Sequence, residues 1–388
     1  MHQVNIDRLR KFVAPEFVFG RGSRYLVDNY LKNYNIRHPL LVTDPGVTKA
    51  GWTADICTVL EKAGIRCTLF SGVTPNPKDS EVMEGSEIYR DRSCDALVAL
   101  GGGSPMDCAK GIGIISSNGG HIRDYKGVDK IATPCPPLIC IPSTAGSAAD
   151  VSQFAIITDT QRKIKMAIVS KMLVPDVSLI DPEITYTMDR ELTAATGMDA
   201  LVHAAEALVS NASSAITDLH ALEAVRLVCR NLKGACEHPR DEKCRKAMMQ
   251  ACLFAGLAFS NASLGAVHAM AHSLGGYKDI PHGICNAILL PHVVDYNFDA
   301  AAAAYMRMGE AMNIPRQGRT PREYKPFILK KIRDFLKILD IGQTLGGLGI
   351  DAEDIPRLAR NAMQDPCILT NPRDPHIPDM ENLYAKAL

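Results

Sequence analysis

Five side chains that commonly bind transition metals lie in two apolar stretches of the second half of this chain. Asp199 and His203 are four residues apart in a helical stretch, so they share one helix face. The other three are histidines, two of them four residues apart and the third in a Pro-His-Gly sequence: His268, His272 and His282. Any four of these five would make a mixed nitrogen and oxygen site. Spacing alone favours His268 and His272 as one ligand pair.

A single histidine on an apolar helix face is more often a core residue with a hydrogen-bond partner than a metal ligand. Here, however, four of the chain's eleven histidines and an aspartate occupy apolar, alanine-rich surroundings where each needs a partner. One metal ion would satisfy most of them together, so we predict a metal site. The His/Asp ligand set suits Fe(II) or Zn(II) better than Mg or Ca.

A glycine-rich segment follows an apolar run in the first half of the chain. Glycines without a Cβ atom let the backbone turn sharply and approach a ligand. Ser104 is expected to be a helix N-cap, with Pro105 in the first helical position and Asp107 as the acid of a capping box. A helix N-terminus of this kind suits a pyrophosphate, although a plain strand–helix turn needs no ligand. The candidate phosphate-binding residues are Gly101, Gly102, Gly103, Ser104 and Asp107.

Two other loops that follow apolar runs could contribute to a cofactor site. Asp44 ends the first apolar strand, where a carboxylate can bind a ribose diol and repel a 2′-phosphate, which favours NAD over NADP. It precedes the glycine loop, whereas the usual dinucleotide acid follows it, and by itself it is more often a turn residue. The small, hydroxyl-rich segment 143–150 either lies against a flat cofactor or is a plain connector.

The pattern of apolar runs predicts an α/β half followed by an all-α half. Short, wholly apolar strands at 39–43, 96–100 and 138–141 alternate with helical segments at 54–63 and 80–91, which indicates a parallel sheet covered on both faces. Beyond Asp181-Pro-Glu, four long stretches have helical periodicity, at 192–210, 215–232, 243–259 and 264–274. We therefore predict an α/β domain at 1–185 and a helical domain at 186–388.

Composition points away from nucleic acid and membrane partners. Forty-three basic residues balance forty-three acidic ones, and the locally basic stretch 316–337 is typical of a solvated helix face. The first thirteen residues lack the apolar core of a signal peptide, and no apolar run reaches the length of a membrane span. Twelve scattered cysteines without a CxxC pair indicate reduced thiols, so we expect a cytoplasmic protein.

The motifs together resemble those of the iron-containing (group III) alcohol dehydrogenases, in the order in which that family has them. The resemblance rests on Phe17-Val-Phe-Gly, GGGSPMDCAK, TAATGMDALVHAAEA, VHAMAHSLGGYKDIPHGICNAILLPH and the segment 365–373 (DPCILTNPR). It covers essentially the whole chain, and the long motif that contains Pro-His-Gly is the most specific. The family has a Rossmann-like N-terminal domain that binds NAD(P), a C-terminal helical domain that binds metal, and an active site in the cleft between them.

The resemblance implies a role for each candidate residue. It assigns the metal to Asp199, His203, His268 and His282, and this overrides the pairing that spacing favours. His272 resembles the family histidine that faces the nicotinamide and substrate and takes part in proton transfer. The implied pyrophosphate, nicotinamide and ribose contacts, besides the glycine loop, are Ser143, Thr144, Ser147 and Lys165.

One segment departs from the family pattern. The family usually has Thr-Thr-Ala-Gly-Thr-Gly-Ser-Glu where residues 143–150 read Ser-Thr-Ala-Gly-Ser-Ala-Ala-Asp. Hydroxyl groups remain at Ser143, Thr144 and Ser147, but Ala148 and Ala149 replace a glycine and a serine. Cofactor geometry or affinity is where we expect any difference from the family.

The implied function is reversible hydride transfer between a small primary alcohol or aldehyde and NAD, assisted by Fe(II) or Zn(II). Family habit implies a homo-oligomer, a dimer or larger. Two other activities are known on this architecture, those of glycerol dehydrogenase and dehydroquinate synthase. A catalytically silent NAD-binding sensor is an alternative of a different class, against which the complete ligand set and His272 argue.

Overall fold

The computed structural model describes residues 11–388 of the 388-residue chain, so most of the segment on which the signal-peptide expectation rests lies outside the described residues. Before it joins the sheet, the chain crosses to the helical half. The Val13 amide donates to Asn261 Oδ1 at 2.6 Å, and Asn261 Nδ2 donates to the Val13 carbonyl at 3.0 Å. These two hydrogen bonds tie the N-terminal segment to the second half of the molecule.

A six-stranded, fully parallel sheet with the order β1-β9-β6-β4-β2-β3 forms the centre of the first half. Its four inner strands are short and mostly apolar, and every residue in them is buried, as expected for a parallel sheet covered on both faces. The three strands expected from the sequence are confirmed as β2, β4 and β6. The strands are β1 Glu16–Phe19, β2 Pro39–Val42, β3 Thr68–Phe70, β4 Ala96–Gly101, β6 Leu138–Pro142 and β9 Val177–Ile180.

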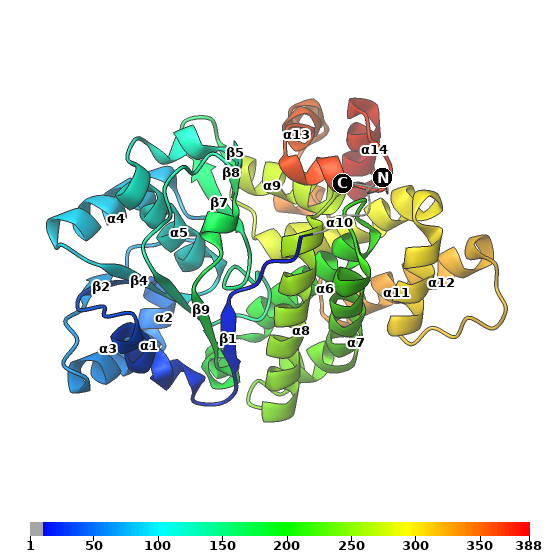
Figure 1. Ribbon diagram of the computed structural model, residues 1–388. Helices are drawn as coiled ribbons and strands as arrows, with labels where there is room; N and C mark the ends of the chain where they lie inside the picture. The colour runs from blue at the N-terminus through cyan, green and yellow to red at the C-terminus, as the bar shows by residue number, and fades with distance from the viewer. Residues whose placement is uncertain (1–10) are drawn as a thin grey trace, which may run out of the picture.

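Helices cover both faces of this sheet (Figure 1). Leu41 of β2 belongs to a core cluster with residues of α1 and α3, whereas its neighbours Leu40 and Val42 belong to one with α4 and α5. Successive residues of a strand point to opposite faces, so this alternation shows that both faces are buried. The helices are α1 Val27–Asn33, α2 Pro45–Lys49, α3 Trp52–Lys62, α4 Asp79–Asp91 and α5 Gly103–Asn118.

A second, three-stranded sheet that the sequence reasoning did not predict lies between this layer and the helical half. It has the order β5-β8-β7, and β7 (Phe154–Asp159) and β8 (Ile164–Val169) form an antiparallel hairpin, with β5 (Gly127–Val128) beside β8. The hairpin turn is held by Asp159, whose Oδ1 accepts from two backbone amides of the turn at 3.0 Å each. The hairpin brings Phe154 and Lys165 to the edge of the cleft described below.

The second half is helical, as expected, and contains no strand among the described residues. Its core is one large cluster built mainly from α6 to α14, which lie on the right in Figure 1. The last strand ends at Ile180 and α6 begins at Arg190, and the domain boundary at 185 stays a prediction. The helices are α6 Arg190–Val209, α7 Ala215–Glu237, α8 Glu242–Ala262, α9 Ala266–Lys278, α10 His282–Asn297, α11 Ala302–Ala311, α12 Pro321–Ile338, α13 Ile355–Ala362 and α14 Ile377–Ala387.

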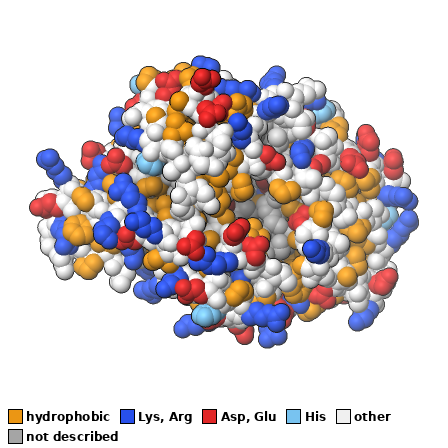
Figure 2. Space-filling view, turned by 180° about the vertical axis from the view of Figure 1, so that it is seen from behind, with side chains coloured by type: hydrophobic (Ala, Val, Ile, Leu, Met, Phe, Trp, Pro, Cys, Tyr) orange, Lys and Arg blue, Asp and Glu red, His pale blue; other side chains and the backbone are white. Residues whose placement is uncertain are grey.

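The surface and the long helices have the features of an ordinary globular fold. The basic stretch 316–337 falls largely on α12, most of whose charged side chains are exposed. Basic and acidic side chains are interspersed over the face in Figure 2. Within residues 11–388 no single helix is long and apolar enough to cross a membrane. Only α8 and α9 taken together meet that criterion, and they are bent by 100° and largely buried in the core.

Candidate metal centre and cofactor cleft

A cleft of about 830 Å³ lies where the carboxyl ends of β2, β4 and β6 meet α6, α9 and α10. All but one of the residues selected from the sequence line it. The exception is Gly101, which ends β4. The lining residues among them are Asp44, Gly102, Gly103, Ser104, Asp107, Ser143, Thr144, Ser147, Lys165, Asp199, His203, His268, His272 and His282.

The glycine loop packs directly against the hydroxyl-rich loop after β6. A Cβ atom on Gly102 would lie 3.2 Å from the Thr144 side chain, and one on Gly103 would lie 3.0 Å from Ser147. A larger residue at either position would therefore force the neighbouring side chain to shift, whereas glycine fits without a shift. The result is a helix N-terminus bordered by two hydroxyl groups, which is suited to an anionic group.

The start of α5 differs from the expectation. The helix begins at Gly103 with Gly102 as N-cap, and no side chain caps it, so the expected roles of Ser104 as N-cap and Asp107 as capping acid were wrong. The extended backbone of Gly102 starts the helix early enough that Ser104 is already helical. Asp107 instead accepts a hydrogen bond from the Ile156 amide at 3.2 Å and so ties α5 to β7. Burial raises the pKa of Asp107 to about 6.

Asp44 was expected to end a strand, but in the structure it caps a helix. Strand β2 stops at Val42, and the Asp44 Oδ1 atom accepts from the Val47 amide at 2.9 Å at the start of α2. The other carboxylate oxygen faces the glycine loop, 3.2 Å from where a Gly101 Cβ would lie. The side chain thus serves as a cap with one oxygen and leaves the second next to the cleft.

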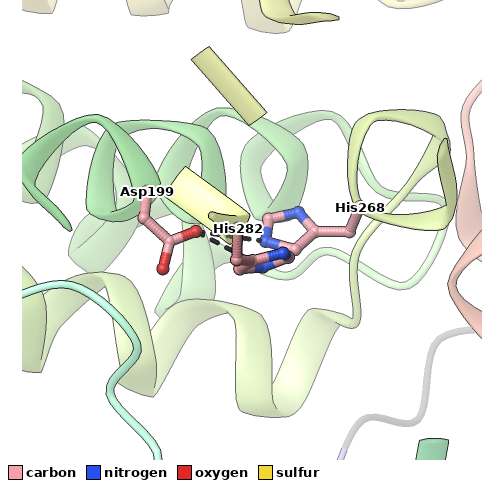
Figure 3. Close-up of side chains that lie close together, drawn as sticks. All are labelled: Asp199, His268 and His282. Atoms are coloured by element: carbon pink, nitrogen blue, oxygen red, sulfur yellow. Dashed lines mark ion pairs between the residues drawn. The ribbon is translucent and has the colours of Figure 1, made fainter. Parts of the chain in front are cut away.

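The proposed metal ligands converge from three helices. Asp199 and His203 come from α6, His268 from α9, and His282 is the first residue of α10. The Nε2 atoms of the three histidines lie 3.9, 3.6 and 3.7 Å from one oxygen, Asp199 Oδ1. Asp199, His268 and His282 form the tightest group (Figure 3). These separations are too long for hydrogen bonds, and they approach the value of about 3.4 Å between two ligands of one tetrahedral metal ion.

His282 reaches the group because the residue after it is a glycine. A Cβ atom on Gly283 would lie 2.3 Å from the carbonyl oxygen of Ala195 on α6, which is an impossible contact. Only glycine lets the first turn of α10 pack this closely against α6. The Pro-His-Gly sequence therefore has a packing reason as well as a chemical one.

Outer partners orient two of the imidazoles. His268 Nδ1 lies 2.6 Å from Glu206 Oε2, and His203 Nδ1 lies 3.2 Å from the Gly146 carbonyl. A hydrogen bond at Nδ1 leaves Nε2 for a metal, as is usual for metal-binding histidines. Glu206 also accepts from the Val267 amide at 2.6 Å, so it holds the first turn of α9 in place.

Asn286 is a further polar residue at the centre of this group. Its Nδ2 atom donates to Asp199 Oδ1 at 2.7 Å and lies 3.2 Å from the Nε2 atoms of both His268 and His282. Asn286 Oδ1 and His282 Nδ1 are buried without a hydrogen-bond partner. Buried polar atoms without a partner are unusual in a folded protein, and a bound ion is one explanation for them.

The charges around the group favour a cation. Burial by itself would raise the pKa of Asp199, but the surrounding histidines His203, His282 and His268 lower it well below its usual range. Burial lowers the pKa of His203 to about 4 and that of His282 well below its ordinary value. Burial also opposes protonation of His268, yet Asp199 and Glu206 raise its pKa to about 9. The site thus combines an ionised, buried carboxylate with two imidazoles held neutral and a third that two carboxylates attract a proton to, and a divalent metal ion could take the place of that proton.

His272 has a different partner from the other histidines. Its Nδ1 atom lies 2.8 Å from Asp365 Oδ2, and Asp365 Oδ1 accepts from the Cys367 amide at 2.9 Å. Its ring stacks on that of His282 at 5.2 Å, and it lines the cleft. The donor-atom group of Asp199, His268 and His282 includes neither His272 nor His203. His203 Nε2 nevertheless lies 3.9 Å from Asp199 Oδ1, whereas His272 has Asp365 as its carboxylate partner. His272 thus lies beside the proposed ligands but has a carboxylate partner of its own, Asp365.

Glu206, Asn286 and Asp365 were missed as site residues by the sequence reasoning. Glu206 lies three residues after His203, and Asn286 four after His282, so each shares a helix face with a proposed ligand. That spacing was a usable signal. Asp365 lies in a distant segment of the sequence, and no local pattern connects it with His272.

Glu206→Gln is expected to weaken metal binding about 10- to 100-fold while the protein stays folded. The amide cannot act as the charged acceptor that fixes the His268 ring and strengthens its donor atom. Competition with a fluorescent chelator measures the affinity, and Glu353→Gln, an exposed position outside the cleft, is the matched control. Wild-type affinity in a folded Glu206→Gln protein would contradict the role.

Comparison with known proteins agrees with this architecture. Two family models match the chain, "Iron-containing alcohol dehydrogenase" over residues 14–182 and "Fe-containing alcohol dehydrogenase family, C-terminal" over residues 193–388. Alcohol dehydrogenase 4 of Schizosaccharomyces pombe is 42 % identical over 97 % of this chain and 89 % of its own length. An NAD-dependent methanol dehydrogenase of Bacillus methanolicus is 35 % identical over 97 % and 99 %. The crystal structure of a 1,3-propanediol oxidoreductase superposes with a TM-score of 0.95 at 38 % identity and covers 98 % of this chain and 100 % of that one.

A parallel-sheet domain joined to a helical domain, with a histidine-rich group in the cleft between them, defines a two-domain oxidoreductase. The chain belongs to the iron-containing alcohol dehydrogenase family. The resemblance seen in the sequence motifs and the predicted fold class are both confirmed.

Proposed function

We propose that this protein catalyses reversible hydride transfer between a small primary alcohol or aldehyde and NAD, with one divalent metal ion bound by Asp199, His203, His268 and His282. Fe(II) is the first candidate and Zn(II) the second, because both accept three histidines and one aspartate. The observation that carries the proposal is the convergence of Asp199, His268 and His282 donor atoms in the same cleft as the glycine loop. The names of relatives that act on alcohols support it.

Different residues along the cleft would bind different parts of the cofactor. The Gly102–Ser104 helix start and the Thr144 and Ser147 hydroxyls would hold the pyrophosphate of NAD, and Asp44 its adenosine ribose. When bound, the metal ion supplies Lewis-acid polarisation of the substrate oxygen, and the nicotinamide exchanges the hydride.

Lys165 and His272 have separate roles in this scheme. Lys165 comes from β8 and forms no hydrogen bond or ion pair within the described residues, so its ammonium group is available to the cofactor. Burial lowers its pKa. His272 would accept the alcohol proton on Nε2, because Nδ1 is bound to Asp365. In aldehyde reduction it would return that proton.

Metal analysis of the purified protein, combined with an alcohol panel followed as NADH formation, tests the proposal. One equivalent of Fe or Zn and steady NADH formation are expected. Removal of the metal with a chelator is expected to abolish single-turnover hydride transfer, and addition of Fe(II) or Zn(II) should restore it. An undiminished single-turnover rate after chelation would contradict the metal's role.

Asp44→Asn and Asp44→Gly are expected to shift the NAD-to-NADP preference by about tenfold or more toward NADP. Both remove the negative charge that would repel a 2′-phosphate. Asparagine also keeps the α2 cap, so it separates the charge from the capping role. The ratio of kcat/KM values for the two cofactors measures the effect. An unchanged ratio in both variants would refute the role of Asp44.

The proposal also includes the oligomeric state and the cellular location of the protein. All twelve cysteines are free, and seven of them are buried, which fits a reducing compartment. A cytoplasmic homo-oligomer remains our prediction, and light scattering of the purified protein measures its size.

A further inference from the structure

The wall of the cleft beside the proposed metal ligands is aromatic. The Phe259 ring stacks on the His203 imidazole with centroids 4.2 Å apart, and Phe154 lies 5.8 Å from Phe259. Both phenylalanines line the cleft, as does Leu264, which precedes α9. A substrate with its oxygen at the metal ligands would therefore extend its carbon chain along an apolar surface.

Phe154 is fixed in its place by a buried ammonium group. Lys110, on α5, donates to the carbonyl oxygens of Ser152 and Phe154 at 2.8 Å each, and only 2 % of its surface is exposed. The Phe154 side chain is itself 7 % exposed and lies in the main core cluster. Backbone anchoring and side-chain packing together hold this wall in place.

The polar side chain next to Phe154 in the lining is already engaged. Ser152 is 2 % exposed, and its hydroxyl lies 3.3 Å from the Lys110 ammonium, from which it accepts. A second hydroxyl group on a substrate chain that lies against Phe154 would thus exchange water for a phenyl ring. Burial of a hydroxyl without a partner is unfavourable.

From these contacts we infer that the substrate site selects primary alcohols whose carbon chain carries no second hydroxyl group, and that Phe154 is the residue that determines this specificity. The inference rests on the proposed function and narrows it. It runs against a simple transfer from the matched 1,3-propanediol oxidoreductase structure, whose name indicates a diol substrate. For a given chain length, the monohydroxy alcohol should exceed the diol about 10- to 100-fold in kcat/KM, which corresponds to about 1.4 to 2.8 kcal/mol.

The test compares 1-propanol with 1,3-propanediol, and 1-butanol with 1,4-butanediol, on the metal-loaded enzyme with NAD, counted per reactive hydroxyl. Equal or higher kcat/KM with the diols overturns the inference but leaves the dehydrogenase function intact. No NADH from any alcohol, with metal bound, contradicts the proposed function and the inference with it. The two failures are therefore distinguishable without any variant.

Substitution of Phe154 tests its part in the selection. Phe154→Ser offers a hydroxyl and space for water, so the alcohol-to-diol ratio should fall at least about tenfold, while Phe154→Leu keeps an apolar wall and the wild-type ratio. The ratio is measured on one preparation and does not depend on the fraction of folded enzyme. A ratio that Phe154→Ser leaves unchanged, or that Phe154→Leu lowers equally, overturns the role of Phe154.

Discussion

His282→Ala is expected to lower metal affinity by more than about 100-fold. This loss should exceed the one expected for Glu206→Gln, which removes only a hydrogen-bond partner of a ligand. His282 Nε2 lies 3.7 Å from Asp199 Oδ1, in a group of donor atoms that also includes His268 and that one ion could bridge. Without this imidazole the ion would keep three protein ligands at most. Loss of the metal should abolish turnover with it.

The fold should tolerate this substitution. His282 is the first residue of α10, its side chain caps nothing, and its Nδ1 atom has no partner. Metal content after dialysis against a limiting metal concentration gives the result, and the melting temperature of the metal-free protein shows that folding is retained. His238→Ala, at an exposed position after α7, is the control and should keep one equivalent. A His282→Ala protein that also keeps one equivalent would remove His282 from the ligand set.

His272→Ala is expected to keep the metal and lower kcat about 10²- to 10⁴-fold, the usual contribution of a positioned acid–base group. The Nδ1 atom of His272 is bound to Asp365, so its ring is oriented and Nε2 is the nitrogen available to the cleft. Alanine removes the group that would accept the substrate proton. It leaves the contacts among Asp199, His268 and His282 intact.

Metal content decides between the two roles that the sequence leaves open for His272. A ligand would lose the metal when replaced, as in His282→Ala, whereas an acid–base group would not. Asp365→Asn should lower kcat by a smaller factor than His272→Ala, because the ring stays but loses its charged partner. If His272→Ala lost the metal, the ligand pair favoured by spacing would be the correct one.

The alternation of apolar runs and helical periods was sufficient to predict the fold class. A parallel strand is buried on both faces, so its sequence is apolar throughout, as in β2, β4 and β6. The hairpin of β7 and β8 was missed because its strands mix buried and partly exposed residues. Its turn signal was present in Asp159, which resembles many ordinary loop aspartates.

Local sequence patterns predicted the helix ends less well than the fold class. Ser104 and Asp107 have the right types and spacing for a capping box, yet α5 begins at Gly103. At its start, α5 packs through Gly102 and Gly103 against the hydroxyl-rich loop after β6. The residues around Ser104 give no sign of this contact. The same holds for Asp44, whose type suggests a strand end or turn and whose place is a helix cap beside the cleft.

The five possible metal ligands and their two clusters were determined by the sequence alone. Which of them lie close enough to share one ion was decided only by the tertiary structure, which groups Asp199, His268 and His282 and leaves the full set of four as our proposal. Helical spacing treats His268 and His272 alike, because both lie on one face of α9. Packing separates them. Gly283 lets α10 carry His282 to Asp199, while the segment 365–370 places Asp365 against His272. Both contacts join residues 83 or more positions apart, and no periodicity within a single helix can specify them.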